Sequence, residues 1–76
     1  MVIIHDIKGL NFDNENIYLE VDGIKVKAPL EKVSQKLLNA SDVQRMIFKI
    51  SPSGYGIHWP LIDEDLAVDP LLKYAV

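Results

Sequence analysis

The chain has 76 residues, a net charge of −3 and no cysteine. This length accommodates one domain, and 49% hydrophobic with 25% charged residues is typical of a globular protein rather than a disordered one. The lack of cysteine excludes disulfides, thiolate nucleophiles and cysteine-ligated zinc, and favours a reducing compartment. No apolar run reaches the roughly 18 residues that a membrane span needs, and the first residues lack the features of a signal peptide. We therefore predict one cytoplasmic domain over residues 1–76, with no membrane association.

The first elements in chain order are a strand and a polar turn. The β-branched residues from Val2 to Ile7 predict a strand that ends before Gly9. His5 lies within this run, where we expect a structural histidine with hydrogen-bond partners. The polar stretch 11–16 predicts a turn, because Asn and Asp side chains bond to their own backbone.

The clearest local pattern is a β-hairpin. Two alternating segments, 17–21 and 24–28, are separated by Asp22-Gly23, a dipeptide that suits a type I′ turn because both central residues need positive φ. This turn sets a register with apolar pairs on one face and polar pairs on the other: Val21–Ile24, Leu19–Val26 and Ile17–Ala28, against Glu20–Lys25 and Tyr18–Lys27. Turn chemistry and both faces therefore predict the same hairpin.

Pro29 marks a change from strand to helical periodicity, and its fixed φ suits the first turn of a helix. Four apolar residues recur at helical spacing after it: Leu30, Val33, Leu37 and Leu38. We predict a central helix here that ends at Asn39. The sequence Ser41-Asp42-Val43-Gln44 then has the form of a capping box, which predicts a helical turn through Arg45.

The segments 47–51 and 57–59 predict a second hairpin. Gly54 and Gly56 lie in the turn between them, where glycine supplies positive φ. The two glycines lack the third glycine and the following helix of a phosphate-binding loop, so nucleotide binding is rejected. Pro60 cannot donate to a ladder and therefore ends the strand or lies at an edge.

A short C-terminal helix completes the prediction. Asp69 is the expected N-cap, Pro70 the first helical residue, and the helix continues through Tyr74. We predict an α+β fold with a small, mostly antiparallel sheet of about five strands, built from two hairpins and the N-terminal strand. The central helix, the helical turn and the C-terminal helix are expected to cover one face of that sheet.

Several motifs occur together in the second half of the chain. They are a glycine-rich turn ending at Gly56, then Ile57-His58-Trp59-Pro60, then Asp63-Glu64-Asp65-Leu66, then Leu71-Leu72. Upstream lie Pro29-Leu30, Asn39-Ala40 and Gln44-Arg45. With these motifs the chain resembles the bacterial family called domain of unknown function 2442. It departs from the family at Ala67, where serine is common.

The resemblance implies a small bacterial protein that works with others. Some members of that family look like one half of a toxin–antitoxin-like gene pair, and others are joined to helix-turn-helix domains. Both contexts imply an interaction or regulatory module, and neither implies a particular chemistry.

The densest acidic cluster is Asp63-Glu64-Asp65. Carboxylates in such a run can ligate a divalent cation, or they can present a negative patch to a basic partner. The third interpretation is a solvated turn in which Asp65 and Asp69 accept backbone N–H bonds. The glycine and the distal glutamate of an EF-hand loop are missing.

His58 and Trp59 are the most chemically suggestive neighbours. Strand alternation places Trp59 in the core and His58 on the opposite face. His58 has the chemistry of a general base that Asp63 or Asp65 orients, but no activated nucleophile accompanies it. An edge-strand histidine bonded to a nearby carboxylate is the simpler interpretation.

We therefore expect a non-enzymatic protein-interaction or regulatory module, antitoxin-like, with no cofactor. Its partner is a small protein or a second copy in a homodimer. The candidate interaction surface comprises five residues: Tyr55, His58, Asp63, Glu64 and Asp65.

Two alternative functions remain open at this stage. One is a nucleic-acid-binding regulator, which the net charge of −3 and the dispersed lysines disfavour, Lys25 and Lys27 being the densest basic spot. The other is a small metal-assisted or acid–base enzyme that uses His58 with Asp63 or Asp65.

Overall fold

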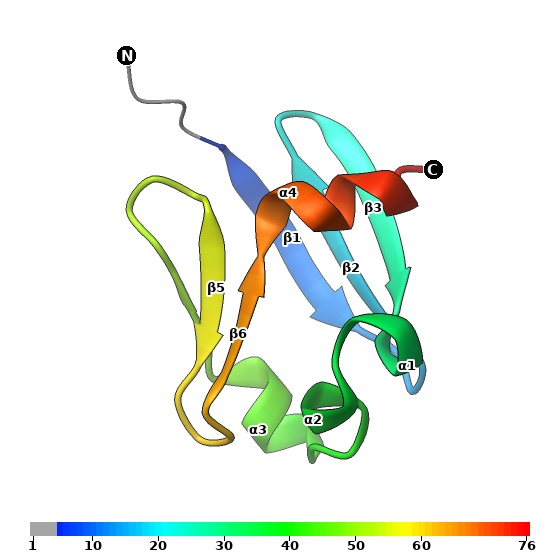
Figure 1. The fold of residues 1–76 in the computed structure, drawn as a ribbon, viewed down its shortest axis with the longest axis vertical. Coiled ribbons are helices and arrows are strands. Elements are labelled where there is room, and N and C mark those ends of the chain that lie inside the picture. The colour runs from blue at the N-terminus through cyan, green and yellow to red at the C-terminus, as the bar shows by residue number, and fades with distance from the viewer. Residues whose placement is uncertain (1–4) are drawn as a thin grey trace.

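The computed structural model describes residues 5–76 and contains two three-stranded antiparallel sheets joined by short helices (Figure 1). Sheet A has the order β1 (Ile7–Phe12), β2 (Asn16–Val21), β3 (Ile24–Pro29), and sheet B has the order β4 (Lys49–Ile50), β5 (Gly56–Trp59), β6 (Glu64–Ala67). The helices are α1 (Leu30–Val33), α2 (Gln35–Leu38), α3 (Asp42–Met46), α4 (Val68–Leu71) and the 3₁₀ turn η1 (Leu72–Tyr74). The chain is thus α+β, as predicted.

The β2–β3 hairpin has the predicted register at every pair. Asp22 and Gly23 have φ of 52° and 84°, as a type I′ turn requires. On the outer face, the ammonium of Lys27 lies 5.9 Å from the centroid of the Tyr18 ring. A local turn is therefore sufficient to set this part of sheet A.

The first strand differs from the prediction. The expected strand began at Val2, outside the described residues, whereas β1 starts at Ile7 and continues through Phe12 into the stretch expected to be a turn. The turn is confined to residues 13–15, and Asp13 organises it by accepting the main-chain N–H groups of Glu15 and Asn16. These bonds and one from the Tyr18 hydroxyl hold the pKa of Asp13 well below its usual range, the Tyr18 bond contributing most.

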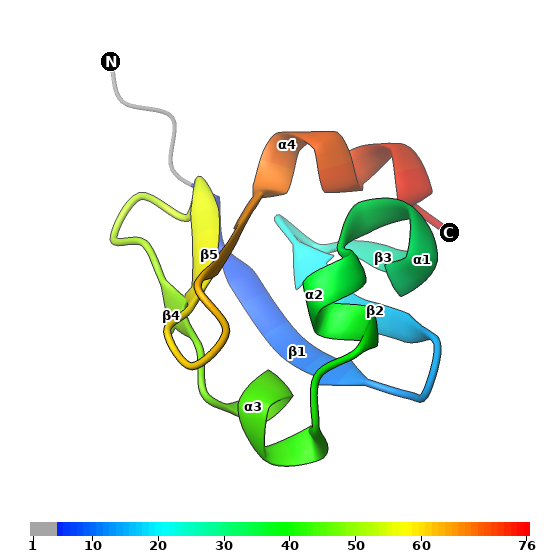
Figure 2. The same ribbon diagram turned by 60° about the horizontal axis from the view of Figure 1, so that its bottom comes forward.

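The prediction of a single five-stranded sheet is wrong. The acidic stretch expected to be a turn contains a sixth strand, β6, which pairs with β5 and completes a separate sheet B. Asp and Glu have low strand propensity, and this propensity argued against a strand there. Pairing with β5, whose Ile57 and Trp59 are buried, overrides it. The helices lie at the ends of two facing sheets instead of covering one face of a single sheet (Figures 1 and 2).

The predicted central helix is divided at Ser34. This residue has extended φ and ψ of −164° and 108° and separates α1 from α2. Its hydroxyl accepts the N–H of Leu37 as the N-cap of α2 and donates to the Glu64 carboxylate. Pro29 precedes α1 as its N-cap residue instead of lying inside the first turn. The capping box at Ser41, by contrast, is present as predicted.

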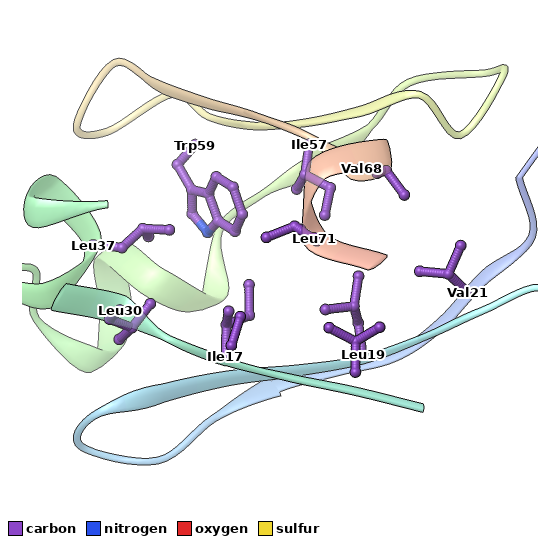
Figure 3. Close-up of a cluster of buried hydrophobic side chains, with 11 residues drawn as sticks. Ile17, Leu19, Val21, Leu30, Leu37, Ile57, Trp59, Val68 and Leu71 are labelled. Atoms are coloured by element: carbon purple, nitrogen blue, oxygen red, sulfur yellow. The ribbon is translucent and has the colours of Figure 1, made fainter. Parts of the chain in front are cut away.

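The core lies between the two sheets, where side chains from both point toward one another (Figure 3). Trp59 is fully buried, as predicted, and its indole N–H donates to the main-chain oxygen of Arg45 at 2.9 Å. The Arg45 side chain is itself buried. Its guanidinium donates to four main-chain carbonyls, those of Asp13, Asn14, Leu37 and Leu38. One residue therefore connects the β1–β2 turn, the end of α2 and strand β5.

The C-terminal helix begins earlier than predicted. Ala67 is the N-cap of α4, and no side chain caps the helix. Val68, the first residue of α4, donates its N–H to the carbonyl of Tyr55, directly beyond the last pair of sheet B, Gly56–Ala67. Asp69 is thereby placed inside the helix, and its carboxylate bonds to His5.

The helical segment continues through Tyr74 as predicted. Val76 then donates its N–H to the carbonyl of Lys25 and covers part of the edge of β3.

Replacing Arg45 with methionine tests its connecting role. Arg45→Met keeps most of the side-chain volume but leaves buried carbonyls without a donor, so we expect a loss of about 3 kcal/mol in the free energy of unfolding. Urea denaturation measures it. The control Lys49→Met lies on the exposed surface and is expected to change stability by no more than about 0.5 kcal/mol. Equal losses in the two variants would contradict the assignment.

Candidate functional site

The outer face of sheet B carries a row of three polar residues. Lys49 lies opposite His58, and His58 lies opposite Asp65. His58 Nδ1 is 2.8 Å from Asp65 Oδ1. Of the two predicted partners, Asp65 is therefore the one that orients His58. The alternation that buries Ile57 and Trp59 turns this row to the outside.

The His58–Asp65 pair is a base with an orienting carboxylate, the arrangement used in general acid–base catalysis. Its side chains are 41% and 74% exposed, so water screens the pair strongly. Hollows of about 300, 310 and 320 Å³ in the described surface are lined by other residues. The pair therefore faces open solvent.

The three residues of the acidic cluster have separate roles. Glu64 accepts the Ser34 hydroxyl and the Asp65 N–H through its two carboxylate oxygens. Asp63 has a φ of 51° in the β5–β6 turn, and its carbonyl accepts the ammonium of Lys36 at 2.9 Å. Glu64 therefore joins the β5–β6 turn to the break between α1 and α2, while Asp63 and Asp65 are exposed. We expected Asp65 to accept a main-chain N–H, but its carboxylate bonds to His58 instead.

Tyr55 lies at the opposite end of β5 from Asp63. Its side chain is exposed, and its ring meets the His5 ring edge-on at a centroid distance of 5.7 Å. The predicted interaction surface is thus not one patch, because β5 separates Tyr55 from the acidic turn and Glu64 bonds internally. Pro60 follows β5 directly and is exposed, and the strand ends before it, as its inability to donate predicts.

His5, Asp22 and Asp69 form a second polar cluster. His5 Nδ1 is 2.7 Å from Asp22 Oδ2, and His5 Nε2 is 2.6 Å from Asp69 Oδ1. The bond to Asp22, followed by that to Asp69, raises the pKa of His5 above its ordinary 6.5. The pKa of Asp22 is lowered by the Asp6 N–H and by His5. The prediction that His5 is hydrogen-bonded is confirmed, although the residue precedes β1 instead of lying in a strand.

The helix α3 carries an apolar face that the sequence analysis did not single out. Val43 and Met46 on α3 and its C-cap residue Ile47 are 67%, 56% and 45% exposed, while Arg45 on the helix is buried. The signal was present in the sequence as apolar residues spaced i, i+3 and i+4 after a capping box. Such spacing usually marks a core-facing side, but here the buried guanidinium takes the inward position.

The predicted basic spot lies on the outer face of sheet A. Lys8, Glu20 and Lys25 are directly opposite one another across the three strands, so an acidic residue lies between two basic ones in the register. A hollow of about 300 Å³ beside this row includes Tyr18, Lys27 and Gly9 in its lining. This face therefore carries three lysines, with Glu20 between Lys8 and Lys25 in the register.

Two further findings concern the part of the chain from residue 5 onward. None of its helices has the length and apolar character to cross a membrane. In the same residues, no three or more His, Asp or Glu side chains are grouped so as to hold a metal ion.

Comparison with protein families identifies the family of this chain. The family model described as protein of unknown function (DUF2442) matches residues 7–76, and the chain belongs to this family. Searches of the curated proteins and of the solved structures gave no match.

The acidic cluster yields a test that separates folding from contact. We expect Glu64→Gln to lower the free energy of unfolding by about 1–2 kcal/mol, because it weakens a charge-assisted bond to the Ser34 cap. Asp63→Asn and Asp65→Asn are each expected to change it by less than about 0.5 kcal/mol, since their carboxylates are exposed. Urea denaturation of the three variants decides it. A larger loss in Asp65→Asn than in Glu64→Gln would contradict the division of roles.

Proposed function

We propose that this member of the DUF2442 family is a non-enzymatic protein-interaction module that acts with a small partner protein, as an antitoxin does. The observation that carries the proposal is the exposed apolar face of α3. Large apolar side chains gathered at one place on a small monomer mark an interaction site. Val43 and Met46 are exposed three residues apart on α3, and the exposed C-cap residue Ile47 follows them, shortly before β4 at the edge of sheet B.

The α3 face is held in place and cannot turn inward. The Ser41 capping box fixes the start of the helix. The Arg45 guanidinium donates to four carbonyls beneath it, and the Arg45 carbonyl accepts the indole of Trp59. Rotating Val43 or Met46 into the core would break these bonds. A preorganised apolar surface loses little conformational entropy on binding, which favours affinity.

The acidic residues beside α3 indicate the chemistry of the partner. A hollow of about 320 Å³ next to Met46 is lined by Asp13, Asn14 and Asp42 as well as by Phe12 and Arg45. Asp42 is exposed in the first turn of α3, whereas the Asp13 carboxylate is occupied by its own turn. We therefore describe the partner as a small protein with an apolar anchor for the α3 face and a basic residue for Asp42.

The two alternatives have weaker support. Acid–base catalysis rests on the His58–Asp65 pair, which lies on an open sheet face. Nucleic-acid binding rests on Lys8, Lys25 and Lys27, and Glu20 lies between the first two. Phosphate contacts depend on uncompensated positive charge. The α3 face requires neither a reactive group nor a basic patch.

Co-purification with matched variants tests the proposal. Tagged protein from the native host is expected to retain one small stoichiometric protein, identified by mass spectrometry. Val43→Glu with Met46→Lys is expected to weaken binding of that protein by about tenfold or more, because the apolar anchor is lost. Both substitutions suit their ends of the helix, so α3 itself should persist.

Ile24→Lys is the control, because Ile24 is also exposed, at 45%, but lies in the β2–β3 hairpin. It is expected to retain the partner with unchanged affinity in a calorimetric titration of the purified pair. A native preparation that contains only this chain, or equal losses in both variants, would overturn the proposal.

A further inference from the structure

His5 has a hydrogen-bonding arrangement that requires a positive charge. Its two ring nitrogens lie 2.7 Å and 2.6 Å from the carboxylate oxygens of Asp22 and Asp69. An ionised carboxylate accepts hydrogen bonds and cannot donate them. With both carboxyl groups ionised, both nitrogens can donate only when each carries a proton, which makes the ring an imidazolium. A neutral ring would direct one lone pair at a carboxylate.

The three residues that contact the His5 ring come from separate parts of the chain. Asp22 is in the β2–β3 turn, Asp69 is in α4, and the ring of Tyr55 in the β4–β5 loop packs edge-on against His5. The main chain takes part as well. His5 donates its N–H to the Ser53 carbonyl, and Asp6 donates its N–H to Asp22 Oδ1. The His5 side chain is only 9% exposed. It therefore joins sheet A, sheet B and α4 at one point.

The His5 main chain packs directly against Gly54. A Cβ atom built on Gly54 would lie 2.0 Å from the His5 carbonyl oxygen. Only glycine at position 54 therefore lets the His5 main chain approach so closely. Gly54 has a φ of 72°. The absence of a side chain here thus serves both the turn and the contact with His5.

Within residues 5–76, the charged and titratable groups that face His5 come from three packed elements and from its own segment. From the packed elements, Asp22 and Asp69 face it with carboxylates, and Tyr55 faces it with its ring. On its own segment Asp6 directs its carboxylate to Lys8 at 3.4 Å. The ring is therefore balanced against two anions, and loss of its proton removes the charge that both of them face.

We propose that His5 is a pH-sensitive latch: its imidazolium holds residues 5–6 over Gly54 and between the β2–β3 turn and α4, and loss of the ring proton releases them. Release separates His5 from Ser53 and Gly54 and frees the Tyr55 ring. The latch is independent of the α3 face and does not require the proposed partner.

The direction of the pH effect follows from the two shifted groups. The pKa of His5 is raised above 6.5 in the folded chain, so its contribution to stability is complete below pH 6.5 and is lost as pH rises through the raised value. The pKa of Asp22 is lowered below 3.8, so its contribution is present above pH 3.8 and is lost on further acidification. The latch is therefore closed between these limits and opens on the alkaline side.

The first experiment follows the ring and the main chain in one titration of the whole protein by NMR. We expect the His5 ring to titrate above pH 6.5 and both ring N–H protons to be visible below its midpoint. Protection factors of the His5 and Asp6 amides are expected to fall by about tenfold or more between about pH 6 and pH 9, after correction for intrinsic exchange. Those of Leu19 in β2 should stay constant. A His5 midpoint at or below pH 6.5, or constant protection of both amides, overturns the proposal.

A matched pair of glycine variants tests the contact between Gly54 and the His5 main chain. Gly54→Ala and Gly9→Ala both place a side chain at positive φ, but only the first meets the His5 carbonyl, since nothing lies within 4 Å of a Cβ on Gly9. We expect Gly54→Ala to abolish the fall in melting temperature between about pH 6 and pH 9, and Gly9→Ala to retain it. Should Gly54→Ala not fold, His5→Gln is expected to give the same flat profile. A pH-dependent fall that persists in His5→Gln overturns the proposal.

Discussion

The buried guanidinium of Arg45 is the interaction on which the rest of the structure depends. It donates to carbonyls at the β1–β2 turn and at the end of α2, and its own carbonyl accepts the indole of Trp59. A buried cation is costly unless every donor finds an acceptor, and here main-chain carbonyls supply the acceptors. The two sheets do not hydrogen-bond to each other as strands. Arg45 therefore links them in place of a continuous ladder.

The buried position of Arg45 and the single core between the sheets also explain which residues are exposed. Because a charged side chain takes the inward side of α3, the apolar residues Val43 and Met46 are left outside. Because one core lies between two sheets, each sheet has an outer face for polar rows such as that containing His58. The apolar face of α3 and the polar row that contains His58 are thus consequences of how a short chain divides a small number of apolar side chains between its interior and its exterior.

Much of the fold could be predicted where neighbours in sequence decide it. The Asp22-Gly23 hairpin and the Ser41 capping box needed only local bonds, and both were predicted residue by residue. The strand β6 was missed because its residues disfavour strands, and only pairing with β5 overrides that preference. The break at Ser34 was missed because the apolar spacing over residues 30–38 is that of one continuous helix, although Ser34 caps α2 locally through Leu37 and also bonds to Glu64, 30 residues away. In the candidate site, a carboxylate partner for His58 was foreseen, but the apolar face of α3 was not, since its spacing is also that of a core helix.

By itself the sequence determined the family, the α+β class, the register of the first hairpin and the burial of Trp59. The family follows from motifs that the chain shares with its members. The other three follow from turn chemistry and from the spacing of apolar residues, which act over a few positions. The tertiary structure alone decided that Asp69 faces His5 across 64 residues and that six strands form two sheets. Contacts of this kind depend on where distant segments meet once the core has formed, and no local preference encodes that meeting.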